Sequence, residues 1–333
     1  MSATTTTLNP QRIMQLSFGF IPSVAVSTAV DLGLFSHIHA GQHTAPQLAE
    51  ACKVSERGIQ SLLYTLSALG LVEQRGQEFF LSADSEAFLV TSAPGYLGGV
   101  LAHQVHQLQQ WARFGEAVRS GTSPLVAVEG KEDDGEFFAG FVDSLFALNW
   151  HAAQAIAERL PPARRALDIG CGSGVWSLAL AQKQPELLVT AVDRAKVLQV
   201  TAYFTSRHNC TDRYTLRDGD LREVELEKDT YDVAYLGHIL HSEGEEASRT
   251  LLRRMHESLK PGGILVVAEM VASQPRSQEM FPNLFDLNML MFTEKGCVFD
   301  RSQLEQMGTE AGFARHEWVD APSPSPILLL HKA

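Results

Sequence analysis

The chain has 333 residues, 45% of them hydrophobic and 20% charged, which is enough apolar material for one large or two ordinary globular domains. Its formal net charge of −12 argues against a nucleic-acid partner, because neutralising phosphates needs clustered Lys and Arg. No apolar run has the length of a membrane span, no secretory signal opens the sequence, and the four cysteines form no CxxC pair. We therefore expect a cytoplasmic enzyme with no membrane partner and no disulfide framework.

Residues 1–100 are expected to form short helices followed by a hairpin. Apolar residues recur at helical spacing from Ser23 to Leu34, Thr44 begins a second helix, and Ser55 can cap a third. Two β-rich runs then surround Gly76. Three helices and a hairpin in this order are typical of a winged-helix domain.

Residues 101–160 form a second, helical region. Helices are predicted from Leu101 to Arg119 and from Glu136 to Leu160, with a loop rich in Gly, Ser and acids between them. Pro161 and Pro162 mark the boundary to a third region, residues 161–333.

In residues 161–333, short β-rich runs alternate with helices, which predicts an α/β domain with a mostly parallel sheet. The runs are Ala166–Ile169, Leu188–Val192, Tyr214–Leu216, Asp232–Leu236 and Ile264–Ala268. Only a Pro-Ser loop joins the last two runs, Phe313–Val319 and Ile327–Leu330, so we expect an antiparallel pair at the sheet edge.

A glycine motif, Asp168-Ile-Gly170-Cys-Gly172-Ser-Gly174, follows the first strand and opens a helix. Glycines let the backbone turn tightly and approach a ligand closely. Asp193 ends the second strand, where a carboxylate can hold both hydroxyls of a ribose. The coincidence of strand, glycine turn, helix and second-strand acid predicts a nucleoside cofactor.

The spacing of the motif narrows the cofactor. A dinucleotide fingerprint is G-x-G-x-x-G, whereas this chain has G-x-G-x-G with Asp168 before it. A carboxylate suits the cationic sulfonium and ammonium groups of S-adenosylmethionine (AdoMet) and is unfavourable for a pyrophosphate. The motif resembles motif I of class I AdoMet methyltransferases, which implies AdoMet as cofactor and S-adenosylhomocysteine (AdoHcy) as product.

Downstream segments resemble the same family. Gly219-Asp220-Leu221 follows the third strand, where the family places an acid and an apolar residue beside the adenine, although Asp220 could equally be an ordinary turn acid. Gly237 stands where many relatives have Lys or Arg, and we include it in the predicted cofactor site.

Within the class I AdoMet methyltransferases, the chain most resembles the small-molecule O-methyltransferases. It rests on His238-Ile-Leu-His241-Ser-Glu-Gly-Glu-Glu-Ala and on Ala268-Glu269-Met270, and this family includes plant phenylpropanoid and flavonoid enzymes, acetylserotonin O-methyltransferase and bacterial tailoring enzymes. Two N-terminal stretches, Val30–Phe35 and Thr65–Val72, resemble its dimerisation domain. The resemblance implies a Rossmann-like methyltransferase domain with a seven-stranded, mostly parallel sheet, preceded by a winged-helix-like domain that forms a homodimer.

The resemblance also implies the catalytic residues. His241 is the general base, and Glu269 and Asp300 flank and orient it. A phenol has a pKa of about 10, so a histidine with a pKa of about 6.5 that takes its proton during attack on the methyl carbon raises its reactivity. His238, three residues earlier on the same helical face, competes for this role. No standard metal-ligand spacing occurs here, so no metal is expected.

The acceptor would lie along Asp286–Thr293, which resembles the family's substrate-lining helix, with Met289 and Thr293 at the matching positions. A Met-rich stripe is equally consistent with plain core. Trp111, Phe146 and Trp150 are predicted to close the roof of the pocket, and His238 to contact the acceptor.

Two other functions remain open. The acceptor atom could be carbon or nitrogen, or the chain could be a winged-helix regulator with a ligand-sensing domain. Against the regulator, residues 1–100 carry four bases (Arg12, Lys53, Arg57, Arg75) and seven acids (Asp31, Glu50, Glu56, Glu73, Glu78, Asp84, Glu86). Such a surface suits a small-molecule enzyme whose N-terminal domain binds a second copy.

Overall fold

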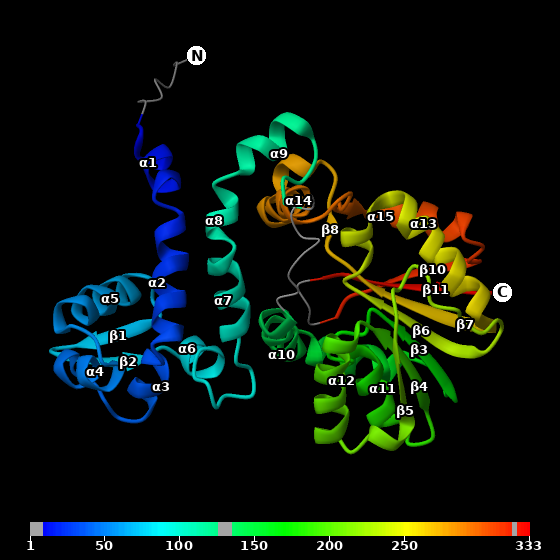
Figure 1. Cartoon of the computed structure of the whole chain (residues 1–333), viewed down its shortest axis with the longest axis horizontal. Coiled ribbons are helices and arrows are strands. Elements are labelled where there is room, and N and C mark those ends of the chain that lie inside the picture. Colours follow the sequence, from blue (N-terminus) through cyan, green and yellow to red (C-terminus); the bar gives the residue numbers. More distant parts are fainter. Residues whose placement is uncertain (1–8, 126–134, 322–324) are drawn as a thin grey trace, which may run out of the picture. The chain divides into compact units, whose positions relative to one another are not determined.

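The computed structural model describes residues 9–125, 135–321 and 325–333, without the side chains of 135–141 and 143 (Figure 1). The chain divides into two compact units, Met1–Gln107 and Leu108–Ala333. Residues 101–107 thus belong to the first unit, and the rest of the helical region belongs with the sheet.

The first unit contains helices and one hairpin in the expected order. Its elements are α1 (Gln11–Ser17), α2 (Phe20–Asp31), α3 (Leu34–His39), α4 (Ala45–Cys52), α5 (Glu56–Ala68), β1 (Val72–Arg75), β2 (Glu78–Leu81), α6 (Ala83–Phe88) and α7 (Gly98–His106). Thr44 and Gln47 form a capping box at α4, and the Ser55 side chain accepts a hydrogen bond from Gly58 N at α5. The helix expected over Ser23–Leu34 is interrupted after Asp31, because Gly33 is left-handed with φ +64°.

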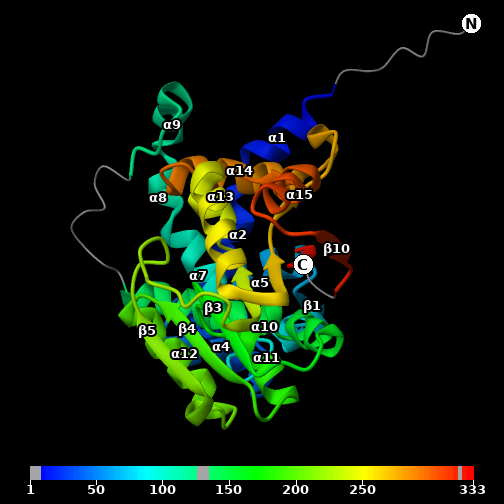
Figure 2. The same ribbon diagram turned by 90° about the vertical axis from the view of Figure 1, so that its right-hand side faces the viewer.

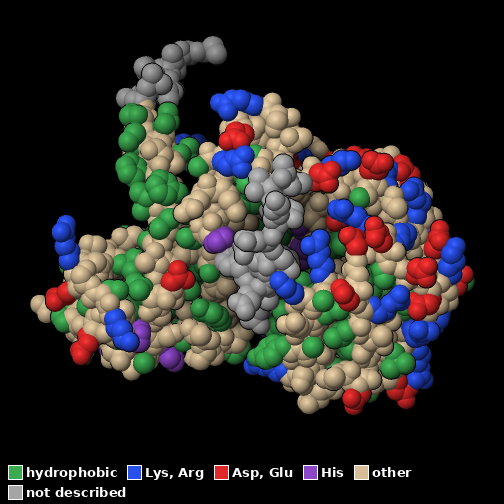
Figure 3. Space-filling model, in the orientation of Figure 1, with side chains coloured by type: hydrophobic (Ala, Val, Ile, Leu, Met, Phe, Trp, Pro, Cys, Tyr) green, Lys and Arg blue, Asp and Glu red, His purple; other side chains and the backbone are tan. Residues whose placement is uncertain are grey.

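Apolar side chains gather along α1 and α2 and remain exposed (green column, upper left in Figure 3). They are Ile13, Met14, Leu16, Phe18, Phe20 and Ile21. The expectation that no apolar stretch is long enough to span a membrane is wrong for this segment: Gln11–Asp31 is long and apolar enough, by length and composition alone. A segment this apolar and this exposed needs a partner surface.

The second unit is built on a seven-stranded sheet. Its strands are β3 (Arg165–Ile169), β4 (Leu188–Asp193), β5 (Tyr214–Asp218), β6 (Tyr231–Gly237), β7 (Leu259–Ala268), β10 (Arg315–Val319) and β11 (Ile327–His331), in the order β10-β11-β7-β6-β3-β4-β5. The first five are parallel, and β11 runs antiparallel to both of its neighbours. The expected sheet and its antiparallel pair are confirmed.

Helices cover both faces of the sheet (Figures 1 and 2). The helices of this unit are α8 (Leu108–Trp111), α9 (Phe114–Ser120), α10 (Gly135–Arg159), α11 (Val175–Lys183), α12 (Ala195–Arg207), α13 (Leu240–Ser258), α14 (Met280–Phe292) and α15 (Arg301–Glu310). Val233 and Tyr235 of β6 pack with α10, α11 and α12, whereas Ala234 and Leu236 pack with α13 and α15. Alternate side chains of the strand therefore pack into the hydrophobic cores on opposite faces of the sheet. The helix expected over Leu101–Arg119 is broken into α7, α8 and α9.

The strand order sets the position of the site. The chain runs from β3 outward to β4 and β5 and then returns to β6 on the other side of β3. Ligands of open α/β sheets bind at the carboxyl ends of the strands where the order reverses. The glycine motif after β3 and Gly237 at the end of β6 both lie at this point. A short parallel pair, β8 (Val271–Ala272) and β9 (Phe299–Asp300), adjoins it.

Candidate active site

The glycine loop after β3 has a backbone that only glycine adopts readily. Gly170, Gly172 and Gly174 have φ of +63°, +55° and +74°. A Cβ at Gly170 would lie 2.4 Å from the side chain of Ile239. The loop is held from outside by Thr201 Oγ1, which donates to Gly172 O at 2.6 Å. The backbone of all three glycines and the space at Gly170 therefore disfavour a side chain, which suits a close approach to a ligand.

Asp193, at the end of β4, joins the second strand to this loop. Its Oδ2 accepts from Gly172 N at 2.9 Å and its Oδ1 accepts from Arg194 N at 2.8 Å. Burial raises the pKa of the carboxyl, and these backbone donors oppose that effect. The carboxylate is fixed beside the loop, where the sequence predicts a ribose.

Asp168 has a different environment, because it is fully buried between β3 and α11. Its Oδ2 accepts from Ser177 Oγ at 2.5 Å, and Ser177 Oγ also lies 3.0 Å from the hydroxyl of Tyr214. Burial raises the pKa of Asp168 to about 7, and the charge of Asp193 adds to this. Asp168 therefore anchors the helix that follows the loop.

The turn after β5 completes this cleft. Gly219 N donates to Asp193 O at 3.2 Å, and the side chain of Asp220 accepts from Arg222 N at 2.8 Å. A Cβ at Gly170 would lie 3.9 Å from Leu221 Cδ2, so Leu221 borders the glycine loop. The structure thus brings together the predicted cofactor residues of β3, β4 and β5.

Trp176, in the first turn of α11, is a site residue that the sequence analysis missed. A Cβ at Gly237 would lie 2.4 Å from two atoms of its indole ring. The ring centroid of Trp176 is 6.1 Å from that of His238. The indole therefore occupies the space that a side chain at position 237 would need. No spacing rule signals this contact; the only hint is a large aromatic residue directly after the glycine motif.

His241 and Glu269 form a buried pair at the ends of β6 and β7. The Nδ1 of His241 is hydrogen-bonded to Glu269 Oε1, and its backbone N donates to Oε2 at 3.1 Å. Burial alone would raise the pKa of Glu269, but the charge and hydrogen bond of His241 outweigh it and the pKa is lowered. With Nδ1–H donating to the carboxylate, Nε2 is the nitrogen that can take a proton. The ring of Phe285, from α14, meets the imidazole edge-on at 4.9 Å.

His238 is held differently. Its backbone is left-handed, with φ +61°, which is rare for a residue other than glycine. Its Nε2 lies 2.9 Å from Ser325 Oγ. Desolvation lowers the pKa of His238 to about 4, although the charge of Glu269 opposes this. A neutral His238 bonded to Ser325 is a weak proton acceptor, so the geometry favours His241 over His238 as the base.

Models of known protein families match most of this chain. Residues 101–314 match the family model of the O-methyltransferase domain, and residues 14–91 match that of the O-methyltransferase dimerisation domain. The chain belongs to the O-methyltransferase family. Like its family, it is an AdoMet-dependent methyltransferase.

Three relatives show the range of the family. The chain is 28% identical over 330 residues to the tetracenomycin polyketide synthesis 8-O-methyl transferase TcmO of Streptomyces glaucescens, covering 97% of each chain. It is 27% identical over 282 residues to the N,N-dimethyltransferase OxyT of Streptomyces rimosus, covering 80% of this chain and 81% of that one. Its fold is similar to that of human N-acetylserotonin methyltransferase in complex with SAM, with a TM-score of 0.85, 20% identity and 100% of both chains covered.

The third predicted catalytic residue of this methyltransferase, Asp300, lies at the start of α15. It caps α15: Oδ1 accepts from Gln303 N at 2.9 Å and Ser302 Oγ at 2.6 Å, and Oδ2 accepts from Gln274 Nε2 at 2.8 Å. No hydrogen bond joins it to His241 in the described parts of the chain. An acid that starts a helix and an acid that orients a histidine look the same in sequence, and the contacts found here are those of a helix cap.

Helix α14 of the methyltransferase lies against the base and carries both predicted acceptor residues. Met289 is buried, and Thr293 ends the helix, with Oγ1 donating to Met289 O and accepting from Gly296 N, both at 2.7 Å. The ring of Trp111 lies 5.7 Å from that of Phe292, so Trp111 packs on this helix as well.

The predicted roof residues Phe146 and Trp150 lie on α10. Phe146 stacks on Phe204 of α12, with ring centroids 3.9 Å apart, and Trp150 lies 5.0 Å from the ring of His208. These contacts place both side chains between α10 and α12, and their predicted role at the roof of the pocket stays a prediction. Among the described residues, no group of three or more His, Cys, Asp or Glu could hold a metal ion.

Proposed function

We propose that this methyltransferase transfers the methyl group of AdoMet to a hydroxyl of a small aromatic or polyketide-like acceptor, with His241 as general base. The acceptor oxygen attacks the methyl carbon while its proton passes to Nε2 of His241, and the bond from sulfur to that carbon breaks. The imidazolium that forms is stabilised by the carboxylate of Glu269. The other product is AdoHcy, whose sulfur is a neutral thioether.

The residues of the cleft fit AdoMet. The left-handed glycine loop would let its backbone approach the cofactor, Asp193 would hold the ribose hydroxyls, and Asp220 and Leu221 would flank the adenine. AdoMet supplies the electrophilic methyl group when bound. Gly237, beneath the indole of Trp176, would border its amino-acid end, and His238 would contact the acceptor as a neutral hydrogen-bonding group.

The His241–Glu269 hydrogen bond is the observation that carries this proposal. A phenol gains nucleophilicity when a base removes its proton, whereas a neutral amine already presents a lone pair. Incubation with AdoMet labelled in its methyl group and a library of phenols, followed by mass spectrometry, should give labelled methyl ethers. Labelled N-methyl products alone, from a matched library of aromatic amines, would contradict O-methylation.

N-methylation is the second candidate, because OxyT, an N,N-dimethyltransferase by name, is similar over 80% of the chain. The same labelling experiment separates the two. If the acceptor is an amine, the rate of methyl transfer should fall little when His241 is replaced, since a neutral amine needs no base.

The N-terminal unit is proposed to form a homodimer. Support comes from the match of residues 14–91 to a dimerisation domain and from the exposed apolar side chains of α1 and α2. In this proposal Ser17–Phe20 reaches the pocket of the partner copy, and the enzyme is cytoplasmic. Light scattering at micromolar concentration should give twice the chain mass, and a stable monomer would overturn the proposal.

A further inference from the structure

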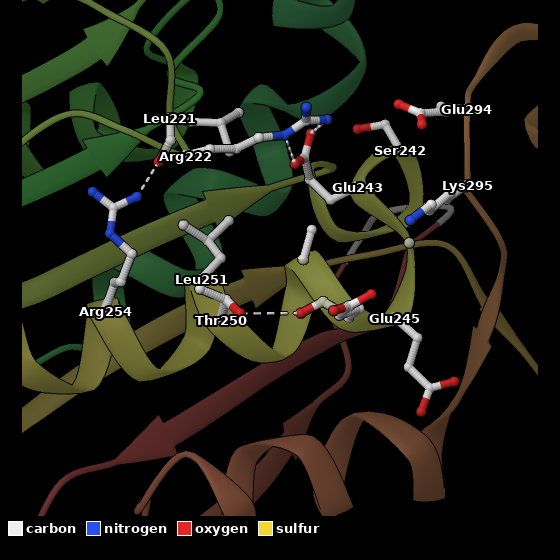
Figure 4. Close-up of a pocket in the computed structure, with 13 residues that line it drawn as sticks. Leu221, Arg222, Ser242, Glu243, Glu245, Thr250, Leu251, Arg254, Glu294 and Lys295 are labelled. Atoms are coloured by element: carbon white, nitrogen blue, oxygen red, sulfur yellow. Dashed lines mark hydrogen bonds and ion pairs between the residues drawn. The ribbon is translucent and has the colours of Figure 1, made fainter.

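The turn after β5, residues 219–224, is bound to helix α13 by two arginines. The guanidinium of Arg222 donates to Glu243 twice, from Nε at 2.6 Å and from Nη2 at 3.3 Å (Figure 4). The Glu243 side chain is only 9% exposed, whereas that of Arg222 is 56% exposed. A carboxylate this buried is costly to leave unpaired, so Arg222 and the turn that carries it are drawn to α13.

Arg254 binds the same turn from the other end of the helix. Its Nη1 donates to Leu221 O at 2.5 Å, and its Nη2 donates to Val224 O. Both acceptors are backbone carbonyls, so the contact fixes the path of the turn. Leu221 lies within the stretch that these bonds hold (Figure 4), and the neighbouring Asp220 side chain accepts from Arg222 N.

Helix α13 is broken between the two attachment points. Gly244 has φ +76° and ψ 174°, and a Cβ there would lie 2.3 Å from Lys295 O. The first turn, with His241 and Glu243, is therefore separate from the helix body with Arg254. Arg222 ties the turn after β5 to the segment that holds the base, and Arg254 ties it to the helix body. The two contacts border one pocket of about 440 Å³.

We propose that Arg222 and Arg254 are positioning residues, which hold the turn 219–224 against α13 so that Asp220 and Leu221 meet the adenosine of AdoMet and the methyl donor is aligned with His241. This rests on the proposed function only where it assigns the adenosine to Asp220 and Leu221. In the described part of the chain, the hydrogen bonds of the two arginines go to Glu243, Leu221 O and Val224 O, and none goes to His241 or Glu269. Their loss should therefore act on cofactor affinity and leave the pH profile of turnover in place.

Calorimetry with AdoHcy tests the Arg254 contact without any acceptor. Arg254→Met keeps an unbranched apolar stem and removes both donors, and it should weaken AdoHcy binding by about tenfold or more. Arg253→Met is the matched control, because Arg253 is exposed on the same helix and, among the described residues, donates only to Thr250 Oγ1. An AdoHcy affinity of Arg254→Met equal to that of Arg253→Met would overturn the proposal.

A charge swap tests the Arg222 contact even if single variants fold poorly. Arg222→Glu should weaken AdoHcy binding, and adding Glu243→Arg should restore most of it by re-forming the pair in reverse. In turnover assays, the single variant should raise KM for AdoMet without moving the pH at which the rate is half-maximal. A double variant no better than the single one, or a shifted pH profile, would show that the pair does not position the cofactor turn. AdoHcy binding can be measured without an acceptor, so the affinities of the variants test this proposal even if the proposed base or acceptor is wrong.

Discussion

Replacing Glu269 by Gln keeps the size of the side chain and removes its charge, which makes it a sharp test of the base. Three donors point at the carboxylate: His241 Nδ1 and Met270 N at Oε1, the latter at 2.7 Å, and His241 N at Oε2, at 3.1 Å. Gln offers one acceptor oxygen and one NH₂ group. With NH₂ in the place of Oε2, it faces the backbone N–H of His241. With NH₂ in the place of Oε1, it faces Met270 N and forces a proton onto Nε2 of His241.

Either orientation leaves one buried backbone N–H without its acceptor, so the variant should lose about 1–3 kcal/mol of unfolding free energy. The second orientation also puts the proton on the nitrogen that must receive one, and both orientations remove the charge that stabilises imidazolium. We expect kcat on a phenolic acceptor to fall by roughly 10²–10⁴-fold, the usual share of general-base catalysis.

The assay is transfer of a labelled methyl group under saturating AdoMet, with thermal unfolding on the same samples. His241→Gln should fall by a similar factor, and both variants should bind AdoHcy almost as the parent does, because neither residue belongs to the predicted nucleoside contacts. His238→Ala should lose less. Full turnover in Glu269→Gln, or a larger loss in His238→Ala than in His241→Gln, would refute the assignment of the base.

Three further outcomes follow from the cleft. Asp193→Ala should weaken AdoHcy binding by about 1.5–3 kcal/mol in calorimetry, the value of a hydrogen bond to a charged group. Gly237→Ala would place a Cβ 2.4 Å from the indole of Trp176, so it should cost about 1–3 kcal/mol of unfolding free energy. Burial raises the pKa of Asp168 to about 7, so the folded state favours the protonated form; its contribution to stability is complete below an unfolded pKa near 3.9 and is lost as pH rises through about 7. Urea unfolding of Asp168→Asn should lack this part of the pH dependence.

Local rules in the sequence were sufficient for much of the fold. The β-rich runs coincide with strands because parallel strands, covered on both faces, need continuous apolar stretches. The Thr44–Gln47 capping box and the three positive-φ glycines are local devices that need no knowledge of distant contacts. The His241–Glu269 pair was accessible by resemblance, since Glu269 directly follows β7 and His241 lies four residues after β6, the neighbouring parallel strand.

The surroundings of the remaining predicted residues depend on contacts between distant segments. Helical spacing places Phe146 and Trp150 on α10 but does not tell which neighbour their face meets, and that neighbour is α12. Asp300 satisfies the sequence rule for a helix cap as well as the family position for an orienting acid, and only the three-dimensional contacts show the cap.

The contact between Gly237 and Trp176 shows that the role of a family position depends on what surrounds it in the structure, and not on its residue type alone. In the sequence, Gly237 is a departure from the family pattern, which often has a Lys or Arg at this position. In the structure, the indole of Trp176 lies so close to Gly237 that no Cβ fits between them. A Lys or Arg at position 237 would therefore require Trp176 to move. The carboxylate hydrogen-bonded to the imidazole of His241 is that of Glu269. In the proposed mechanism it is therefore this buried carboxylate that stabilises the imidazolium as it forms.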